Sequence, residues 1–235
     1  SSLINQCVTK GLDPNVEMKD SGVEWIGKIP KGWQVKKIKY VLKSVGGGTP
    51  NTEVKEYWDG SIPWISPKDM KSDDINNSED KITEDGLENS TTNLIDPGSV
   101  LMVVRSGILK HTIPVGINTI PVTLNQDMKS LTPKNGLIDT KFFFHFVRGN
   151  QKNLLLEWSK LGVTVESLET EFVENSQLPL PPLFEQKQIS DYLDRKTQQI
   201  DDLIEKTERK IELLKEQRSS LINQCVTKGL DPNVE

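Results

Sequence analysis

The chain has 235 residues, of which 34% are hydrophobic and 27% are charged, and its formal net charge is −5. This length and composition predict one or two folded domains and exclude a disordered chain. The sequence contains no apolar run of about 18 residues that would span a membrane and no amino-terminal secretory signal. We therefore expect a cytoplasmic protein. Its two cysteines and two histidines are too few and too scattered to predict a disulfide framework or a metal site.

The two ends of the chain carry the same string. Residues 1–17, SSLINQCVTKGLDPNVE, return unchanged at 219–235, so that Cys7 and Cys225 occupy equivalent positions. The second copy closes a long helical pattern, and we therefore predict that the first copy is the stub and linker of a preceding helix. One unit of a tandem protein and an engineered permutation would both give this pattern, and both interpretations stay open.

Residues 18–182 mix strand-like and helical patterns and are predicted to form an α+β domain. GSIPWIS and PGSVLMVVRSG are short runs rich in Val, Ile and Trp that follow turns, which is typical of strands, and GGGTP is expected to be a loop. TKFFFHFVRGNQKNLLLEWSKLG is apolar at helical spacing and predicts a helix that ends at Gly162. The phenylalanines of this segment are expected to lie in the core; they are Phe142, Phe143, Phe144 and Phe146.

The charge is unevenly distributed along the chain. Residues 101–165 contain eight basic and three acidic residues, a local charge of +5, and six further lysines lie between Lys28 and Lys43. The acidic residues gather at Asp69–Glu88 and in the carboxyl-terminal segment. This segregation permits a basic face on an acidic protein, although ordinary solvated lysines would give the same composition.

The segment 183–230 is predicted to be one long helix, followed by a tail at 231–235. Pro181 and Pro182 precede it, no further proline occurs until residue 232, and Gly229 supplies a stop signal. Apolar residues recur at alternating spacings of four and three, which indicates a heptad seam that packs on a partner helix; a helix lying back on its own domain is the alternative. The predicted dimerisation residues are Leu193, Ile200, Ile204, Ile211, Leu214 and Leu221.

Several motifs together resemble the specificity subunit of a type I restriction–modification system. They are SGVEWIGKIPKGWQVKKIKYV, GGGTP, YWDGSIPWIS, ITEDGL, NQDMKSL and, most telling, LPLPPLFEQKQISDYLD. The resemblance implies a target-recognition domain followed by a conserved helix, and the full subunit of that family has two such units whose helices pair antiparallel and space two DNA half-sites. This chain resembles one half. Two copies would then associate as a homodimer through the helix, or the chain is a fragment.

The resemblance places the globular domain on double-stranded DNA, and polar residues in its loops are the candidates for contact. VVRSGILKHT and LNQDMK carry side chains that bind base edges or phosphates, and the glycines of GGGTP can bring backbone donors near a phosphate. Taken singly, each of these is more commonly a plain surface or turn residue. The predicted DNA-binding residues are Gly47, Gly48, Thr49, Lys68, Arg105, Ser106, Lys110, His111, Asn125, Gln126, Lys129, Lys160 and Thr164.

No catalytic residues are predicted. The sequence has no Asn/Asp-Pro-Pro-aromatic motif, no GxGxxG and no nuclease-like cluster of acids. The resemblance implies a non-catalytic subunit without a cofactor of its own, whose modification and restriction partner subunits carry the S-adenosylmethionine and ATP chemistry. The alternative functions are a coiled-coil assembly adaptor without direct DNA binding and an independent DNA-cutting or DNA-modifying enzyme.

Overall fold

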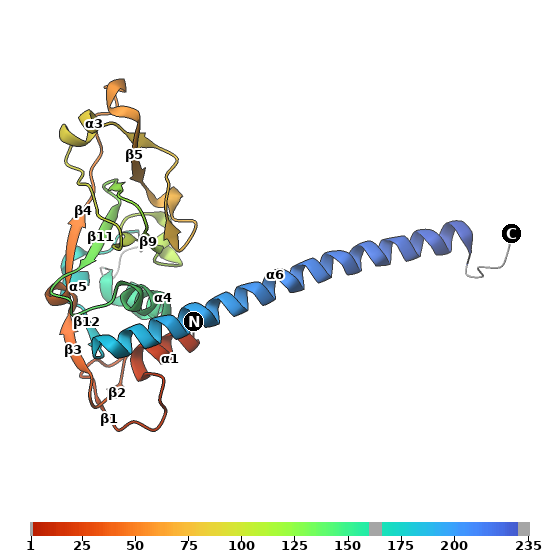
Figure 1. The fold of residues 1–235 in the computed structure, drawn as a ribbon, viewed down its shortest axis with the longest axis horizontal. Helices are drawn as coiled ribbons and strands as arrows, with labels where there is room; N and C mark the ends of the chain where they lie inside the picture. The colour runs from red at the N-terminus through yellow and green to blue at the C-terminus, as the bar shows by residue number, and fades with distance from the viewer. Residues whose placement is uncertain (1, 160–165, 230–235) are drawn as a thin grey trace. The chain divides into compact units, whose positions relative to one another are not determined.

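The computed structural model describes residues 2–159 and 166–229. The chain divides into two compact units, Ser1–Ser190 and Asp191–Glu235. The first unit mixes short sheets with helices and the second continues one long helix, so the predicted α+β class with a long carboxyl-terminal helix is confirmed (Figure 1).

A five-stranded sheet is the largest sheet of the first unit. The strand predicted within PGSVLMVVRSG is present as β8, Val100–Val103, and all of its side chains are buried. β11 lies between β8 and β4 and pairs antiparallel with both, whereas β6 pairs parallel with β9 at the edge. The strand order is β4 (Leu42–Gly46), β11 (Met128–Pro133), β8, β9 (Val115–Asn118) and β6 (Asp74–Ile75).

A second sheet has three strands, with β5 in the middle. β10 pairs parallel with β5, in the register Thr123↔Trp64 and Leu124↔Ile65, and β7 pairs antiparallel. Because parallel strands end at the same edge, the loops after β5 and β10 leave the sheet together. The elements of this region are η1 (Lys55–Tyr57), β5 (Trp58–Ile65), η2 (Pro67–Asp69), β7 (Lys81–Ile82), α3 (Glu84–Glu88), η3 (Gly107–Lys110) and β10 (Thr123–Leu124).

Helix α4, Thr140–Trp158, carries much of the core. Asp139 caps its start by accepting a hydrogen bond from Phe142 N. The four phenylalanines of the helix are buried, as predicted. The helix ends four residues before the predicted stop at Gly162, because Ser159 is extended and the Trp158 carbonyl accepts the backbone N–H of Glu169 at 2.8 Å. Gly162 itself lies outside the described residues.

Two small two-stranded sheets complete the first unit, and helix α1 packs on α4 and β2. The first copy of the repeat is thus helical, as predicted. The elements are α1 (Ser2–Lys10), β1 (Met18–Asp20), β2 (Lys28–Pro30), β3 (Gln34–Lys37), α2 (Ile38–Val41), α5 (Thr170–Asn175) and β12 (Gln177–Leu180), with β1 paired to β2 and β12 to β3.

The long helix α6, Leu183–Lys228, starts directly after the two prolines and is followed by Gly229 with φ +77°. Its first turn is fixed within the first unit. Trp33 Nε1 donates to Glu185 Oε2 at 2.9 Å, and the fully buried Gln186 donates to the carbonyls of Leu137 and Pro181. The end of the motif LPLPPLFEQ therefore holds the start of α6 to the first unit through hydrogen bonds of Glu185 and Gln186.

Candidate nucleic-acid interface

Three loops of the first unit meet at the ends of β4, β8 and β10, and we call residues 46–49, 105–110 and 124–129 the loop cluster. Gly48 N donates to Leu124 O at 2.9 Å, and Gly47 N donates to Met128 O at 3.3 Å. The side chains of Thr49 and Gln126 are hydrogen-bonded to each other. The pairing of β4 with β11 thus joins two segments about 80 residues apart in the sequence.

The glycines of GGGTP serve close packing in this structure. A Cβ on Gly47 would lie 2.1 Å from Asn125 O, and one on Gly48 would lie 2.2 Å from Thr91 Oγ1. Both distances are shorter than any real contact, so only glycine fits. The backbone N–H groups of Gly47 and Gly48, which we expected to donate to a phosphate, already donate to carbonyl oxygens of the chain.

Arg105 is held to the cluster by Asp127. Its Nε donates to Asp127 Oδ1 at 2.5 Å, and the backbone N–H groups of Val104 and Arg105 both donate to the carbonyl of Asp127. The Arg105 side chain stays 59% exposed. An ion pair on one edge of a guanidinium fixes its direction while the fork still presents donors outward. Asp127 organises this arrangement, and no signal in the sequence distinguished it from an ordinary surface acid.

Asn125 has a different environment from its neighbour Gln126. Asn125 is buried, its Oδ1 accepts from Asp127 N at 3.0 Å, and its Nδ2 lies 3.4 Å from Asp127 Oδ2. These contacts shape the turn rather than leaving the amide free for a base. Gln126 is exposed, and so is the more accessible of the two amides for an adenine edge.

The loop after Arg105 contributes one more basic side chain. Lys110 Nζ pairs with Glu166 Oε1 at 2.8 Å, and this contact lowers the pKa of the Glu166 carboxyl. Ser106 caps η3 by accepting from Ile108 N, and its own N–H donates to the Glu166 carbonyl. Lys129, on β11, lies next to Gly46 at the rim of the cluster. Two cations of the cluster, Arg105 and Lys110, are therefore paired with acids.

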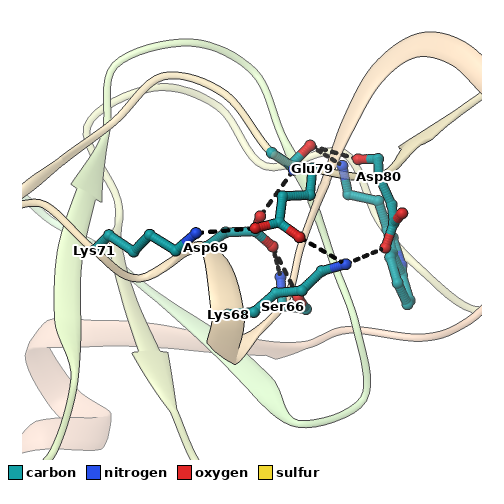
Figure 2. Close-up of polar contacts among 8 residues, drawn as sticks. Ser66, Lys68, Asp69, Lys71, Glu79 and Asp80 are labelled. Carbon is teal, nitrogen blue, oxygen red and sulfur yellow. Dashed lines mark hydrogen bonds and ion pairs between the residues drawn. The ribbon is translucent and has the colours of Figure 1, made fainter.

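Two predicted residues belong to other surroundings. His111 faces α4, where it lines a pocket of about 610 Å³ together with polar residues that include Asn5, Arg148 and Asn150. Lys68 lies in a network around η2, shown in Figure 2. The predicted residues Lys160 and Thr164 lie outside the described residues.

The network around Lys68 neutralises its charge. Lys68 Nζ lies 2.8 Å from Asp80 Oδ2 and 3.3 Å from Glu79 Oε2, while Lys71 also pairs with Glu79 (Figure 2). Asp69 accepts hydrogen bonds from the backbone N–H groups of Ser66 and Glu79, and so joins the two ends of the segment 66–79. Hydrogen bonds to Asp80 and Glu79 raise the pKa of Lys68, and the two lysines lower the pKa of Glu79.

The second unit carries an unpaired apolar stripe. Ile200, Ile204, Ile211, Leu214 and Leu221 are 46–53% exposed, whereas Leu193 is fully buried. The portion of the predicted seam that is open to a partner helix therefore begins after Leu193. A stripe of this length on an isolated helix favours pairing, because contact with water is unfavourable for apolar surface and pairing buries it.

The described part of the chain contains no group of three or more His, Cys, Asp or Glu side chains placed to hold a metal ion. Among the described helices, none is both long and apolar enough to cross a membrane.

Known proteins match this chain over most of its length. The model of the type I restriction modification DNA specificity domain matches residues 30–213. The specificity subunit of the type I restriction enzyme EcoR124I/EcoR124II of Escherichia coli is 35% identical over 208 residues, which cover 87% of this chain and 48% of that protein. That of MjaIX from Methanocaldococcus jannaschii is 34% identical, over 80% of this chain and 42% of that protein.

The fold is also found among solved structures. The HsdS subunit from Thermoanaerobacter tengcongensis aligns with a TM-score of 0.66 at 15% identity, over 97% of this chain and 50% of that one. The chain thus spans about half the length of the relatives that it matches. With the family model covering most of the sequence and the fold in agreement, the chain belongs to the family of type I restriction modification DNA specificity domains.

Proposed function

We propose that this chain is a sequence-specific DNA-recognition unit of a type I restriction–modification complex and reads one half of a bipartite target. The observation that carries the proposal is the loop cluster, where Asp127 aims the exposed guanidinium of Arg105. Arg binds the O6 and N7 of guanine through two donors at once, and a pre-aimed side chain loses less conformational entropy on binding. Gln126 beside it is a candidate reader of adenine.

Arg105→Ala should weaken binding to the target duplex by roughly tenfold to a hundredfold, because one bidentate base contact is worth about 1–3 kcal/mol. Binding to unrelated duplexes should change little. Lys129→Ala should instead weaken binding to all duplexes alike and reduce the salt dependence of binding by about one phosphate contact. Fluorescence anisotropy over a salt series measures both effects.

The target for this titration would come from selection of duplexes out of a random pool, or from methylome mapping of a host that carries the gene with its partner subunits. A symmetric interrupted motif would indicate two copies of this unit, and an asymmetric one would indicate a second, different domain. If neither variant alters binding to any duplex, the assignment of Arg105 and Lys129 is wrong.

We further propose that two copies pair antiparallel through α6, and that the pair docks modification subunits, with a restriction subunit completing the complex. The exposed stripe from Ile200 to Leu221 supports pairing. We propose no catalysis for this chain: methyl transfer and ATP-dependent steps would belong to partner subunits that bind S-adenosylmethionine and ATP. Incubation of the pure chain with DNA, Mg²⁺ and S-adenosylmethionine tests this, and turnover would contradict it.

The double substitution Ile204→Asp with Ile211→Asp should convert the dimer to a monomer, because two carboxylates would be buried in the seam without partners. Sedimentation velocity measures the molar mass. The matched control is Gln199→Asp with Gln217→Asp, which adds the same charge to α6 at exposed positions outside the predicted seam and should leave the dimer intact. A wild-type chain that is monomeric at all concentrations would contradict pairing through α6.

The exposed stripe would serve equally in an assembly adaptor that never touches DNA. The same two measurements separate the functions. An adaptor would show the dimer together with a flat DNA titration, whereas the recognition unit requires duplex binding that falls with salt.

A further inference from the structure

Within the described residues, the repeated string folds in the same way at both ends of the chain. Residues 2–10 form α1, and the equivalent residues 220–228 form the end of α6. Each copy is followed by a glycine in the left-handed region, with φ +80° at Gly11 and +77° at Gly229. Each glycine N–H donates to the carbonyl of the equivalent cysteine at 3.1 Å. The two copies are therefore interchangeable in sequence, helical conformation and cap.

The first copy occupies a fitted site on α4. Asn5 Nδ2 donates to Asn150 Oδ1 at 2.5 Å, and Asn150 is itself buried. A Cβ on Gly149 would lie 2.9 Å from Asn5 N, so that glycine lets the two helix backbones come close. Cys7 and Val8 are buried in this contact region.

The end of α1 is held as well. Lys10 Nζ donates to the carbonyl of Ile26 at 2.8 Å and also to the carbonyl of Lys28, and partial burial lowers the pKa of Lys10. Gly149 on α4, a buried amide acceptor and two carbonyls thus contact α1 at separate points along its length. We call this surface, centred on Gly149 and Asn150, the α4 site.

The second copy presents the same face without a partner. Val226 is 79% exposed, whereas the equivalent Val8 is fully buried. Cys225, Leu221 and Ile222 are exposed too. The equivalents of Asn5, Cys7 and Val8 in the second copy are Asn223, Cys225 and Val226, which are exposed and carry the same side chains for the α4 site.

We propose that the α4 site is a receptor for the end of α6 from a second copy of this chain, and that α1 is the competitor that fills the site in cis. The occupant is specified by sequence, because residues 219–229 repeat residues 1–11. α1 has the advantage of attachment to the same chain, at an effective concentration on the order of millimolar. The exchange therefore becomes visible when α1 is selectively weakened. The inference does not depend on DNA binding.

The two cysteines report occupancy of the site. Burial raises the pKa of the Cys7 thiol, and burial also shields it, so that Cys7 should react slowly with iodoacetamide while the exposed Cys225 reacts fast. Trypsin releases SSLINQCVTK from both copies, and these peptides have the same mass in the unsubstituted chain. A substitution in one copy gives them different masses, so that mass spectrometry reads each cysteine separately.

Val8→Asp and Val226→Asp make a matched pair, since each places the same carboxylate in one of two identical sequences. In Val8→Asp, α1 should leave the α4 site, so that Cys7 becomes reactive. As the protein is concentrated from micromolar towards millimolar, the unsubstituted ends of α6 should fill the vacated sites of other copies. The reaction rate of Cys225 should then fall about tenfold. In Val226→Asp, Cys7 should stay protected and Cys225 reactive at all concentrations. The double variant should leave both thiols reactive.

Three results would overturn the proposal. One is a Cys225 rate in Val8→Asp that does not depend on protein concentration. Another is a Cys7 that stays protected in Val8→Asp. The third is protection of Cys225 in Val226→Asp that rises with protein concentration, which would assign the protection to the α6 seam. If Val8→Asp is too unstable to label, the acetylated peptide SSLINQCVTKGL should raise its melting temperature and SSLINQCDTKGL should not; absence of that difference would also overturn it.

Discussion

Replacing Gln186 with glutamate should lower the free energy of unfolding of the first unit by about 4 kcal/mol at neutral pH. In the native side chain Nε2 donates to the carbonyls of Pro181 and Leu137 at 2.8 and 2.9 Å, and Oε1 accepts from Asp139 N at 2.8 Å. A carboxylate has the same shape but no donors. It would turn negative oxygens towards two carbonyls in a fully buried site, at the point where α6 begins and α4 is capped.

The loss should depend on pH with a definite sign. Burial and the two carbonyls would raise the pKa of the introduced carboxyl above its value of about 4.3 in the unfolded chain. The folded state then binds the proton more tightly than the unfolded state does. Q186E should therefore be most stable below the unfolded-state pKa of about 4.3, and it should lose stability as the pH rises through the raised pKa of the folded state. Urea unfolding at a series of pH values measures this.

Gln188→Glu is the matched control for this experiment. Gln188 lies two residues further along α6 and is exposed, so the same change should alter stability by less than about 0.5 kcal/mol. Equal stabilities for Q186E and Q188E across the pH series would contradict the role that we assign to LPLPPLFEQ.

Gly47→Ala should destabilise the chain by about 3 kcal/mol and weaken DNA binding with it. The added Cβ would meet Asn125 O at 2.1 Å and Leu124 O at 2.3 Å. These are backbone atoms, which cannot rotate away as a side chain does, so β4 and the 124–129 loop would have to separate. That separation moves the Asp127 carboxylate that aims Arg105. Thermal unfolding and anisotropy with the selected duplex measure the two effects.

Gly107→Ala is the control within the same loop cluster. Nothing lies within 4 Å of a Cβ at Gly107, and its φ is not in the left-handed region. The change should leave stability unchanged or raise it by a few tenths of a kcal/mol, because alanine restricts the unfolded chain. If G47A and G107A behave alike, close packing is not the reason for glycine in GGGTP.

Patterns within a few turns of chain were enough to predict several elements. Two prolines, the heptad spacing and Gly229 predicted α6, and the apolar run of β8 predicted a strand. The phenylalanines of α4 were predicted as core for the same reason. These signals are local, since a helix or strand repeats its environment at a fixed period.

The contacts that build the candidate site are not local. Arg105 and Asp127 are 22 residues apart in the sequence, and Thr49 and Gln126 are 77 apart. β11 brings these segments together because it pairs with β4 on one side and β8 on the other. From the sequence alone, Asn125 and Gly47 were candidates for contact with DNA, and Asp127 was not among the candidates.

The two copies of the repeat have the same sequence and the same secondary structure but different burial. By itself the sequence determined that the repeated segment is helical and ends at a glycine, and residues 2–11 and 220–229 both have this structure. Only the tertiary structure decided that Val8 is fully buried while Val226 is 79% exposed. Helix formation and capping depend on residues within a turn or two. Burial depends instead on which distant surface the helix contacts, and here α4 packs on the first copy.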